Sequence, residues 1–344
     1  MHLYWRGNVS ANQQKKSPLP YTKENNQTST QMKYAVIGTG AIGGYYGSKL
    51  ARAGKEVHFL LHSDYEEVKR NGLVIDSYEG NYVLPHVNAY CSVNDMPQVD
   101  VVIVALKSVS NHLLADLLPP LLHPNTLVLL IQNGIGVEED VQKMFPETWL
   151  AAGLAFICSS KIGAGHIHHQ FYGNINIGNY SCHDEEKVTL LIREMREAGI
   201  GAALVDYAEA RWKKAVWNMP FNGMTVALNT QTIDLVSNPH TCQLIRMQGR
   251  EVVRAAQALG VKNIDDAFVE KMIDNTLSMP PYSPSMKLDY DYHRPMEIHY
   301  LYTRPIEMAQ EAGIEMPRLK MLETELLFIE SRQNTAKWGI ATGK

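Results

Sequence analysis

Three polar side chains recur at a spacing of four within an apolar segment in the second half of the chain. They are Lys214, Asn218 and Asn222, and aromatic and aliphatic residues flank them. On a helix, this spacing places the three along one face, with a drift of about 40° per step. A lysine and two amides on a half-buried face suit a polar cleft; a solvated stripe on a surface helix is the alternative. Pro220 predicts a kink in this helix, which would point Asn222 in a different direction from the other two.

A second polar group lies further along the chain, in the segment Ser283–Asp289. It contains Ser285, and Glu297 follows twelve residues after that serine, near the start of a helix that Pro295 is expected to open. A serine-rich loop and a carboxylate at a helix start have an ordinary structural interpretation as capping residues. The residues alone therefore leave a structural and a functional interpretation open.

A glycine-rich turn near the beginning of the chain has the spacing Gly-x-Gly-x-x-Gly. Gly38 allows a tight turn, Gly40 lets the backbone approach a pyrophosphate, and Gly43 lets a helix pack closely on a strand. Ala41 and Ile42 lie in the first turn of that helix, whose free N–H groups and positive dipole end attract phosphates. Because a strand precedes the turn, and a helix and a second strand follow it, the segment predicts a dinucleotide site.

A parallel sheet is required to position these residues. Near-continuous apolar runs, typical of parallel strands covered on both faces, predict its strands. Ligands of such sheets bind beyond the carboxyl ends of the strands, which places Lys107 and Asn133 at the cofactor crevice. A solvated loop is the alternative for both residues. The predicted strands are Lys33–Gly38, Glu56–Leu61, Asp100–Ala105 and Leu127–Ile131. We therefore expect an α/β fold with an N-terminal Rossmann-type dinucleotide-binding domain.

The end of the second strand bears on which dinucleotide is bound. NAD sites usually carry Asp or Glu there, to hold the ribose hydroxyls. This chain has His62 and Ser63 at that point, followed by Asp64. His62 and Ser63 could accept a 2′-phosphate, although neither is a fixed cation. We therefore favour NADP(H) as the cofactor, with Asp64 as the residue that argues against it.

The rest of the first half predicts further strands. Gly72–Leu84 resembles a hairpin, and Ala151–Gly178 predicts antiparallel strands with turns at Gly163–Gly165 and Gly173-Asn174. His166 and His168 would share one strand face, but no third ligand is evident and we expect no metal.

From about residue 206 the apolar pattern becomes helical, so the second domain is expected to be a helical substrate domain. The chain then divides into a tail over residues 1–31, a Rossmann-type domain over 32–205 and an all-helical substrate and catalytic domain over 206–344. The predicted helices are Tyr207–Leu228, Thr241–Leu259, Asp265–Asn275, Pro295–Ala312 and Pro317–Ser331.

Composition sets the remaining limits. The 344 residues carry a net charge of −4, which provides no general field to attract nucleic acid or an anionic membrane. No apolar run is long enough to span a bilayer. Four scattered cysteines indicate a reduced, cytoplasmic protein. Residues 1–31 are polar and are interpreted as a disordered tail or as sequence upstream of a start at Met32, with a transit peptide as the alternative.

In this order, these segments resemble the ketopantoate reductase (2-dehydropantoate 2-reductase) family over about residues 33–335. The first matching segment is generic, whereas the last two, with their spacing, are fairly specific. The matching segments are Gly-Thr-Gly-Ala-Ile-Gly-Gly at 38–44, Ala-Leu-Lys at 105–107, Gln-Asn-Gly at 132–134, Trp-Lys-Lys-Ala-Val-Trp-Asn-Met-Pro-Phe-Asn at 212–222, and Ser-Met-Lys-Leu-Asp at 285–289 with Glu297 beyond it.

The resemblance implies an NADPH-dependent reduction of ketopantoate to pantoate, in pantothenate biosynthesis and the coenzyme A pathway. Lys214 would donate the proton to the ketone oxygen, and Glu297 would hold the substrate hydroxyl. Asn218, Asn222, Ser285 and Asn133 would bind the substrate. His62, Lys107 and Asn133 would join the glycine turn in binding the cofactor. The implied partner is a small 2-oxo acid, and a homodimer is the protein partner that we consider.

The chain departs from the family pattern at several positions. His62 stands where the family commonly has Arg, His299 where it often has Asp, and Thr303 near a common glycine. These differences concern the substrate more than the reaction type, so a relative that acts on another branched 2-oxo acid is one alternative. A β-hydroxyacid dehydrogenase and a non-catalytic NADPH-binding sensor are the others.

Overall fold

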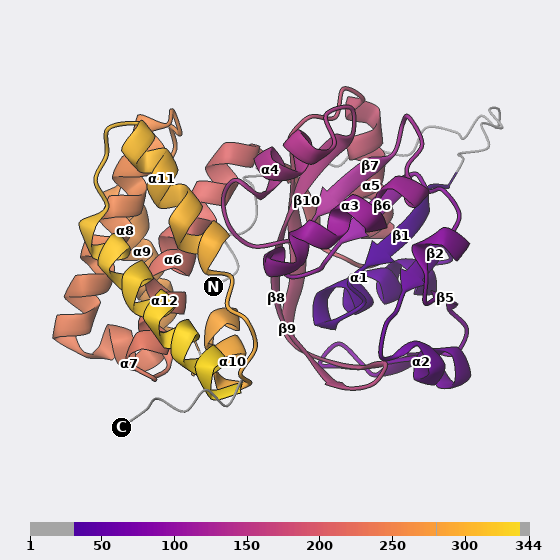
Figure 1. The fold of residues 1–344 in the computed structure, drawn as a ribbon, viewed down its shortest axis with the longest axis horizontal. Coiled ribbons are helices and arrows are strands. Elements are labelled where there is room, and N and C mark those ends of the chain that lie inside the picture. Colours follow the sequence, from indigo (N-terminus) through magenta and orange to yellow (C-terminus); the bar gives the residue numbers. More distant parts are fainter. Residues whose placement is uncertain (1–30, 280, 338–344) are drawn as a thin grey trace, which may run out of the picture.

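The computed structural model describes residues 31–279 and 281–337, so nearly all of the tail expected over residues 1–31 lies outside the described residues. Figure 1 shows a sheet-containing half beside a helical half. The sheet has the strand order β4-β3-β9-β8-β7-β6-β1-β2-β5, and β10 pairs with β9. The strands are β1 Lys33–Ile37, β2 Glu56–Leu60, β3 Leu73–Ser77, β4 Tyr82–Leu84, β5 Asn88–Tyr90, β6 Val101–Val104, β7 Leu127–Leu130, β8 Trp149–Gly163, β9 His166–Asn179 and β10 Ala202–Val205.

The central strands β1, β2, β6 and β7 are parallel, and β1, β6 and β7 have buried residues on both faces. In β1, Tyr34 and Val36 belong to one apolar core, and Ala35 and Ile37 belong to another. This alternation confirms the prediction of a parallel sheet covered on both faces. The helices of this half are α1 Ala41–Arg52, α2 Tyr65–Asn71, α3 Leu114–Leu117, α4 Val137–Met144 and α5 Glu185–Glu197, with 3₁₀ turns η1 Val93–Asp95, η2 Ser108–Leu113 and η3 Pro119–Leu121.

The longest strands, β8 and β9, form an antiparallel arm with its turn after Gly163, as predicted. The hairpin expected over Gly72–Leu84 is also present, as β3 and β4. The second predicted turn, at Gly173-Asn174, is wrong: this dipeptide lies inside β9, where Phe156 pairs with Asn174 and the next residue, Ile157, pairs with Tyr172. Gly173 is therefore the extra residue of a bulge, with φ +111°, and a Cβ there would lie 2.6 Å from the hydroxyl of Tyr45.

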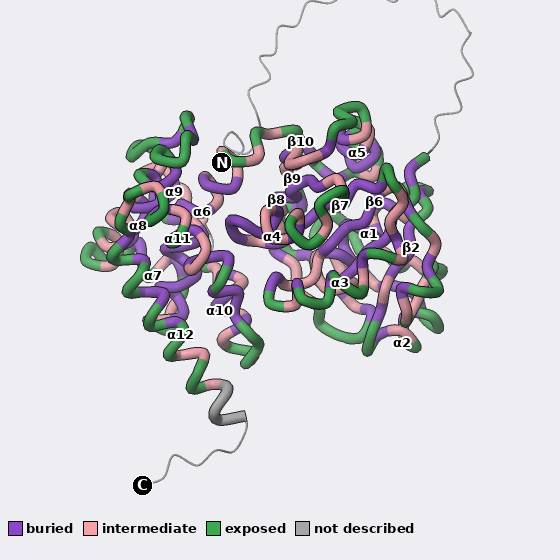
Figure 2. The backbone as a smooth tube through the Cα atoms, turned by 45° about the horizontal axis from the view of Figure 1, so that its top comes forward, coloured by how far each residue is buried: buried purple, intermediate pink, exposed green. Residues whose placement is uncertain are grey.

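The helical half is built around α6, which contacts α7, α8, α9, α10 and α12. Figure 2 shows that the buried residues of the helical half face its interior and that its exposed residues lie on the outer helices. The helices are α6 Tyr207–Ala227, α7 Thr232–Ser237, α8 Pro239–Ala258, α9 Asp266–Leu277, α10 Ser285–Asp291, α11 Arg304–Glu311 and α12 Pro317–Lys337, with a π-helical segment η4 His299–Thr303 before α11. None of the helices in the described part of the chain could cross a membrane.

Two expectations for this half need correction. The loop predicted over Ser283–Asp289 contains helix α10, and α7 was not predicted. The helix expected to begin at Pro295 begins only after Glu297. Helix α6 includes Pro220, as predicted, and the kink expected at this proline stays a prediction.

Candidate active site

The glycine turn after β1 has the shape that a bound dinucleotide needs. Gly38 has φ +89°, and a Cβ there would lie 2.5 Å from the backbone nitrogen of Leu106. A Cβ at Gly43 would lie 2.4 Å from the carbonyl oxygen of Gly38. A Cβ at Gly40, in contrast, would meet nothing within 4 Å, and no acidic residue lies in the first turn of α1. The turn thus leaves open space beside the positive end of a helix, which fits a pyrophosphate.

At the end of β2, His62 and Ser63 are exposed and Asp64 is buried. The carboxylate of Asp64 accepts hydrogen bonds from Lys161 Nζ at 2.6 Å, from the Gly165 backbone nitrogen at 2.9 Å and from Ser63 Oγ at 3.0 Å. Burial alone would raise the pKa of Asp64, but these donors hold it below its usual range. Asp64 is therefore an anchor for the β8–β9 arm.

Lys107 lies after β6, where it precedes the 3₁₀ turn η2. Its ammonium forms an ion pair with Asp289 of α10, a buried carboxylate that also accepts a hydrogen bond from Arg294 Nε at 3.0 Å. Asn133 follows β7 and is half-buried. The next residue, Gly134, packs against η4, since a Cβ there would lie 2.5 Å from that of Tyr300. The strand ends of one half thus meet the helices of the other.

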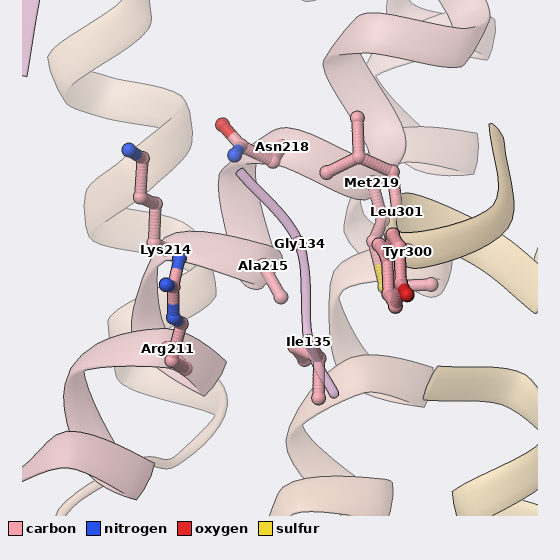
Figure 3. Close-up of a pocket in the computed structure, with 9 residues that line it drawn as sticks. All are labelled: Gly134, Ile135, Arg211, Lys214, Ala215, Asn218, Met219, Tyr300 and Leu301. Atoms are coloured by element: carbon pink, nitrogen blue, oxygen red, sulfur yellow. The ribbon is translucent and has the colours of Figure 1, made fainter. Parts of the chain in front are cut away.

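Lys214 lies on α6 and faces the β8–β9 arm. Its Nζ donates a hydrogen bond to the carbonyl oxygen of Ala155 at 2.9 Å and lies 5.2 Å from the centroid of the Phe156 ring. Figure 3 shows Lys214 and Asn218 on successive turns of α6, in the wall of a small pocket that Arg211 also lines. The structure therefore brings two members of the predicted polar row together.

The pKa of Lys214 is lowered to about 7. Burial is the main cause, the positive charge of Arg211 adds to it, and the negative charge of Glu297 opposes it. Tyr300 of η4 lines the small pocket beside Lys214 as well as the larger one beside Glu297.

Glu297 is buried two residues before the start of η4, and the sheet-containing half holds its carboxylate. Its Oε1 accepts hydrogen bonds from Ser108 Oγ at 2.8 Å and from the Ser108 backbone nitrogen at 2.9 Å. A pocket of about 310 Å³ opens at this point. Its lining residues are Ser108, Val109, Asn111, His112, Glu297, His299 and Tyr300.

The third member of the polar row has different contacts. Asn222 donates to the carbonyl oxygen of Asn218 at 3.0 Å, and its Oδ1 accepts from the Met286 backbone nitrogen at 3.1 Å. Asn222 therefore holds the beginning of α10, where Ser285 is the first residue and is half-buried. Neither Asn222 nor Ser285 lines the two pockets described above.

A buried ion pair that the sequence did not predict joins the two halves. Arg211 of α6 pairs with Glu138 of α4, and its Nη1 donates to the carbonyl oxygen of Gln132 at 2.6 Å. Tyr207 also donates to Glu138, at 3.0 Å. The sequence contained one indication that Arg211 belongs to the site: it lies three residues before Lys214 and so shares its helix face.

One of the two histidines considered as metal ligands has an ordinary contact. His166 Nε2 lies 2.7 Å from Asp76 Oδ2. Across residues 31–279 and 281–337, the side chains include no group of three or more His, Cys, Asp or Glu arranged to hold a metal ion.

Comparisons with known proteins agree with this architecture. Sequence models described as Ketopantoate reductase PanE/ApbA and its C-terminal part match residues 34–181 and 206–330. The 2-dehydropantoate 2-reductase of Nostoc sp. is 44% identical over 313 residues, which cover 89% of this chain and 98% of that protein. The crystal structure of 2-dehydropantoate 2-reductase from Geobacter metallireducens has a TM-score of 0.83 at 36% identity, covering 86% of this chain and 99% of that one. D-mandelate dehydrogenase with NADH and anilino(oxo)acetate shares the fold, with a TM-score of 0.79, 22% identity and coverage of 88% and 100%.

Together with these relatives, a Rossmann-type half joined to a helical half identifies the class of protein as a pyridine-nucleotide-dependent oxidoreductase. Within that class, the chain belongs to the ketopantoate reductase family.

Proposed function

We propose that this chain is an NADPH-dependent 2-dehydropantoate 2-reductase, which reduces ketopantoate to pantoate in pantothenate biosynthesis. The observation that carries the proposal is geometric: Tyr300 lines both the pocket of Lys214 and the pocket of Glu297, where the two halves meet. The proposal also places the enzyme in the cytoplasm. Formation of a homodimer stays a prediction.

The glycine turn fits the cofactor, and Gly38, Gly40, Ala41, Ile42 and Gly43 would hold its pyrophosphate. His62, Lys107 and Asn133 would bind its remaining parts. When bound, NADPH supplies the hydride for the ketone carbon.

The residues of the chain supply the proton and the position of the substrate. Negative charge grows on the ketone oxygen during reduction, and the Lys214 ammonium stabilises this charge and donates its proton there. Glu297, whose Oε1 is held by Ser108, accepts a hydrogen bond from the substrate hydroxyl. Asn218, on the turn of α6 after Lys214, binds the substrate beside it. Asn133 and Ser285 complete the site, and a direct contact of Asn222 with substrate stays a prediction.

One observation favours a substrate other than ketopantoate. His299 lines the 310 Å³ pocket beside Glu297, at a position where the family often has an aspartate. A neutral or positive imidazole in place of a carboxylate would alter which groups this wall accepts. Another branched 2-oxo acid is therefore the alternative substrate for the same chemistry.

A panel of 2-oxo acids tests the proposal with the purified full chain. Initial rates are measured with NADPH and with NADH as ketopantoate, 2-oxoisovalerate and phenylglyoxylate are varied. We expect ketopantoate with NADPH to give the highest kcat/KM. A preference for another 2-oxo acid would establish the alternative substrate, and NADPH binding without turnover of any acid would indicate a sensor protein.

A further inference from the structure

The β8–β9 arm brings a distant lysine to the end of β2. Figure 1 shows β8 and β9, which belong to the sheet, curving toward α2 at their far end. Ser159 Oγ on this arm donates to the carbonyl oxygen of Ala41, in the first turn of α1, at 3.2 Å. Two residues further on, Lys161 reaches Asp64, the residue that precedes α2. The arm therefore connects the first turn of α1 with the end of β2.

Lys161 is partly accessible to solvent, whereas its partner Asp64 is buried. The side chain of Lys161 is 38% exposed, whereas that of Asp64 is 7% exposed. Asp64 also accepts from Gly165 and Ser63, so its oxygens are committed to the protein. An ammonium has three N–H donors, and Asp64 accepts one of those of Lys161. Two donors thus remain on a partly exposed ammonium, which shares Asp64 Oδ1 with the hydroxyl of Ser63.

We propose that Lys161 binds the 2′-phosphate of NADPH and thereby sets the preference for NADPH over NADH. This inference rests on the proposed function and adds the residue that selects the cofactor. In Rossmann-type sites the end of the second strand meets the ribose that carries the 2′-phosphate or hydroxyl. His62 and Ser63 supply no fixed cation there, and Lys161 does. Asp64, held by its three donors, does not accept the ribose hydroxyls as the acid of an NAD site would.

Binding measurements test this role without turnover. The full chain and its Lys161→Gln variant are titrated with NADPH, NADH, adenosine 2′,5′-bisphosphate and adenosine 5′-monophosphate. Loss of a charge-assisted hydrogen bond is expected to weaken binding of both 2′-phosphorylated ligands by about 10- to 100-fold. Binding of NADH and of the monophosphate is expected to stay the same, because neither ligand carries a 2′-phosphate for the Lys161 ammonium to bind. Lys161→Arg should retain most of the affinity for NADPH.

Controls separate this role from a structural one. Lys69→Gln changes another lysine near the site, on α2, and should leave all four affinities unchanged. Because Lys161→Gln leaves a buried carboxylate unpaired, Lys161→Gln is also made in an Asp64→Asn background, where it should still weaken NADPH binding. Equal weakening of NADPH and NADH, or no change in either, would overturn the proposal. A wild-type protein that binds NADH as tightly as NADPH would overturn it too, and would separately contradict the NADPH dependence of the proposed function.

Discussion

The amine of Lys214 experiences opposing influences on its charge. Burial and the Arg211 guanidinium favour the neutral amine, and Glu297 favours the ammonium. The result is a pKa of about 7, far below that of an exposed lysine. A general acid is most effective when its pKa lies close to the working pH. The surroundings of Lys214 therefore suit it to donate a proton under neutral conditions.

The kcat/KM for reduction should fall as the pH rises. Lys214 donates only when it is protonated, so its acid form is present below about pH 7 and is lost as the pH rises through that value. We expect kcat/KM for reduction to be level on the acidic side and to fall about tenfold per pH unit on the alkaline side. Initial rates across this range, at saturating NADPH, measure the profile. A level profile through pH 7 and beyond would contradict this assignment.

Spacing along the chain was enough to predict some site residues and not others. Lys214 and Asn218 share a helix face, so a period of four predicted that they lie together. Ser108 and Glu297 are 189 positions apart, Lys161 and Asp64 are 97 apart, and Arg211 and Gln132 are 79 apart. No local pattern encodes such pairs, because the packing of the two halves and the curvature of the β8–β9 arm bring them together.

At the scale of elements, the helices and strands with the strongest apolar patterns were the ones that the sequence predicted correctly. The buried strands β1, β6 and β7 were predicted within two residues because apolar runs specify them locally. Helix α10 was missed because its seven residues give too little periodicity. Tertiary contacts hold it instead: Asn222 binds its first turn and Lys107 pairs with Asp289. The bulge at Gly173 was taken for a turn because glycine is common in both.

The contact between Asn222 and α10 predicts a loss of stability. Asn222→Ala leaves the buried backbone N–H of Met286 without its acceptor, which should lower the free energy of unfolding by about 1–3 kcal/mol. Urea denaturation followed by circular dichroism measures the change. Asn218→Ala is the matched comparison, because its carboxamide lines the small pocket, and it should affect the KM for substrate more than stability. Unchanged stability of Asn222→Ala, with a raised KM, would indicate a direct substrate contact instead.

At the scale of the whole molecule, a fully buried ion pair helps to join the two halves. Arg211 and Glu138 are both buried, one on the helical side and one on the sheet side. Breaking such a pair from one side is costly because the remaining charge has no counterion in a low-dielectric interior. The same guanidinium lies beside Lys214, so the contact that joins the halves also tunes the amine.

Substitutions in this pair should reveal its contribution to stability. Arg211→Leu is expected to lower the free energy of unfolding by about 3–5 kcal/mol, because Glu138 stays charged and unpaired. Adding Glu138→Gln removes that charge and keeps an acceptor for Tyr207, so the double variant should recover most of the loss. Thermal and urea unfolding are measured for the wild type, Arg211→Leu, Glu138→Gln and the double variant, which together form a double-mutant cycle. A double variant no more stable than Arg211→Leu would contradict this explanation.

The most direct test of the account is the turnover of Lys214→Ala. We expect kcat for NADPH-dependent reduction of ketopantoate to fall by about 10²- to 10⁴-fold, with NADPH affinity largely intact. Lys213→Ala, which removes the neighbouring lysine paired with Glu209, should retain wild-type kcat. Undiminished turnover in Lys214→Ala would contradict the assignment of Lys214 as the proton donor.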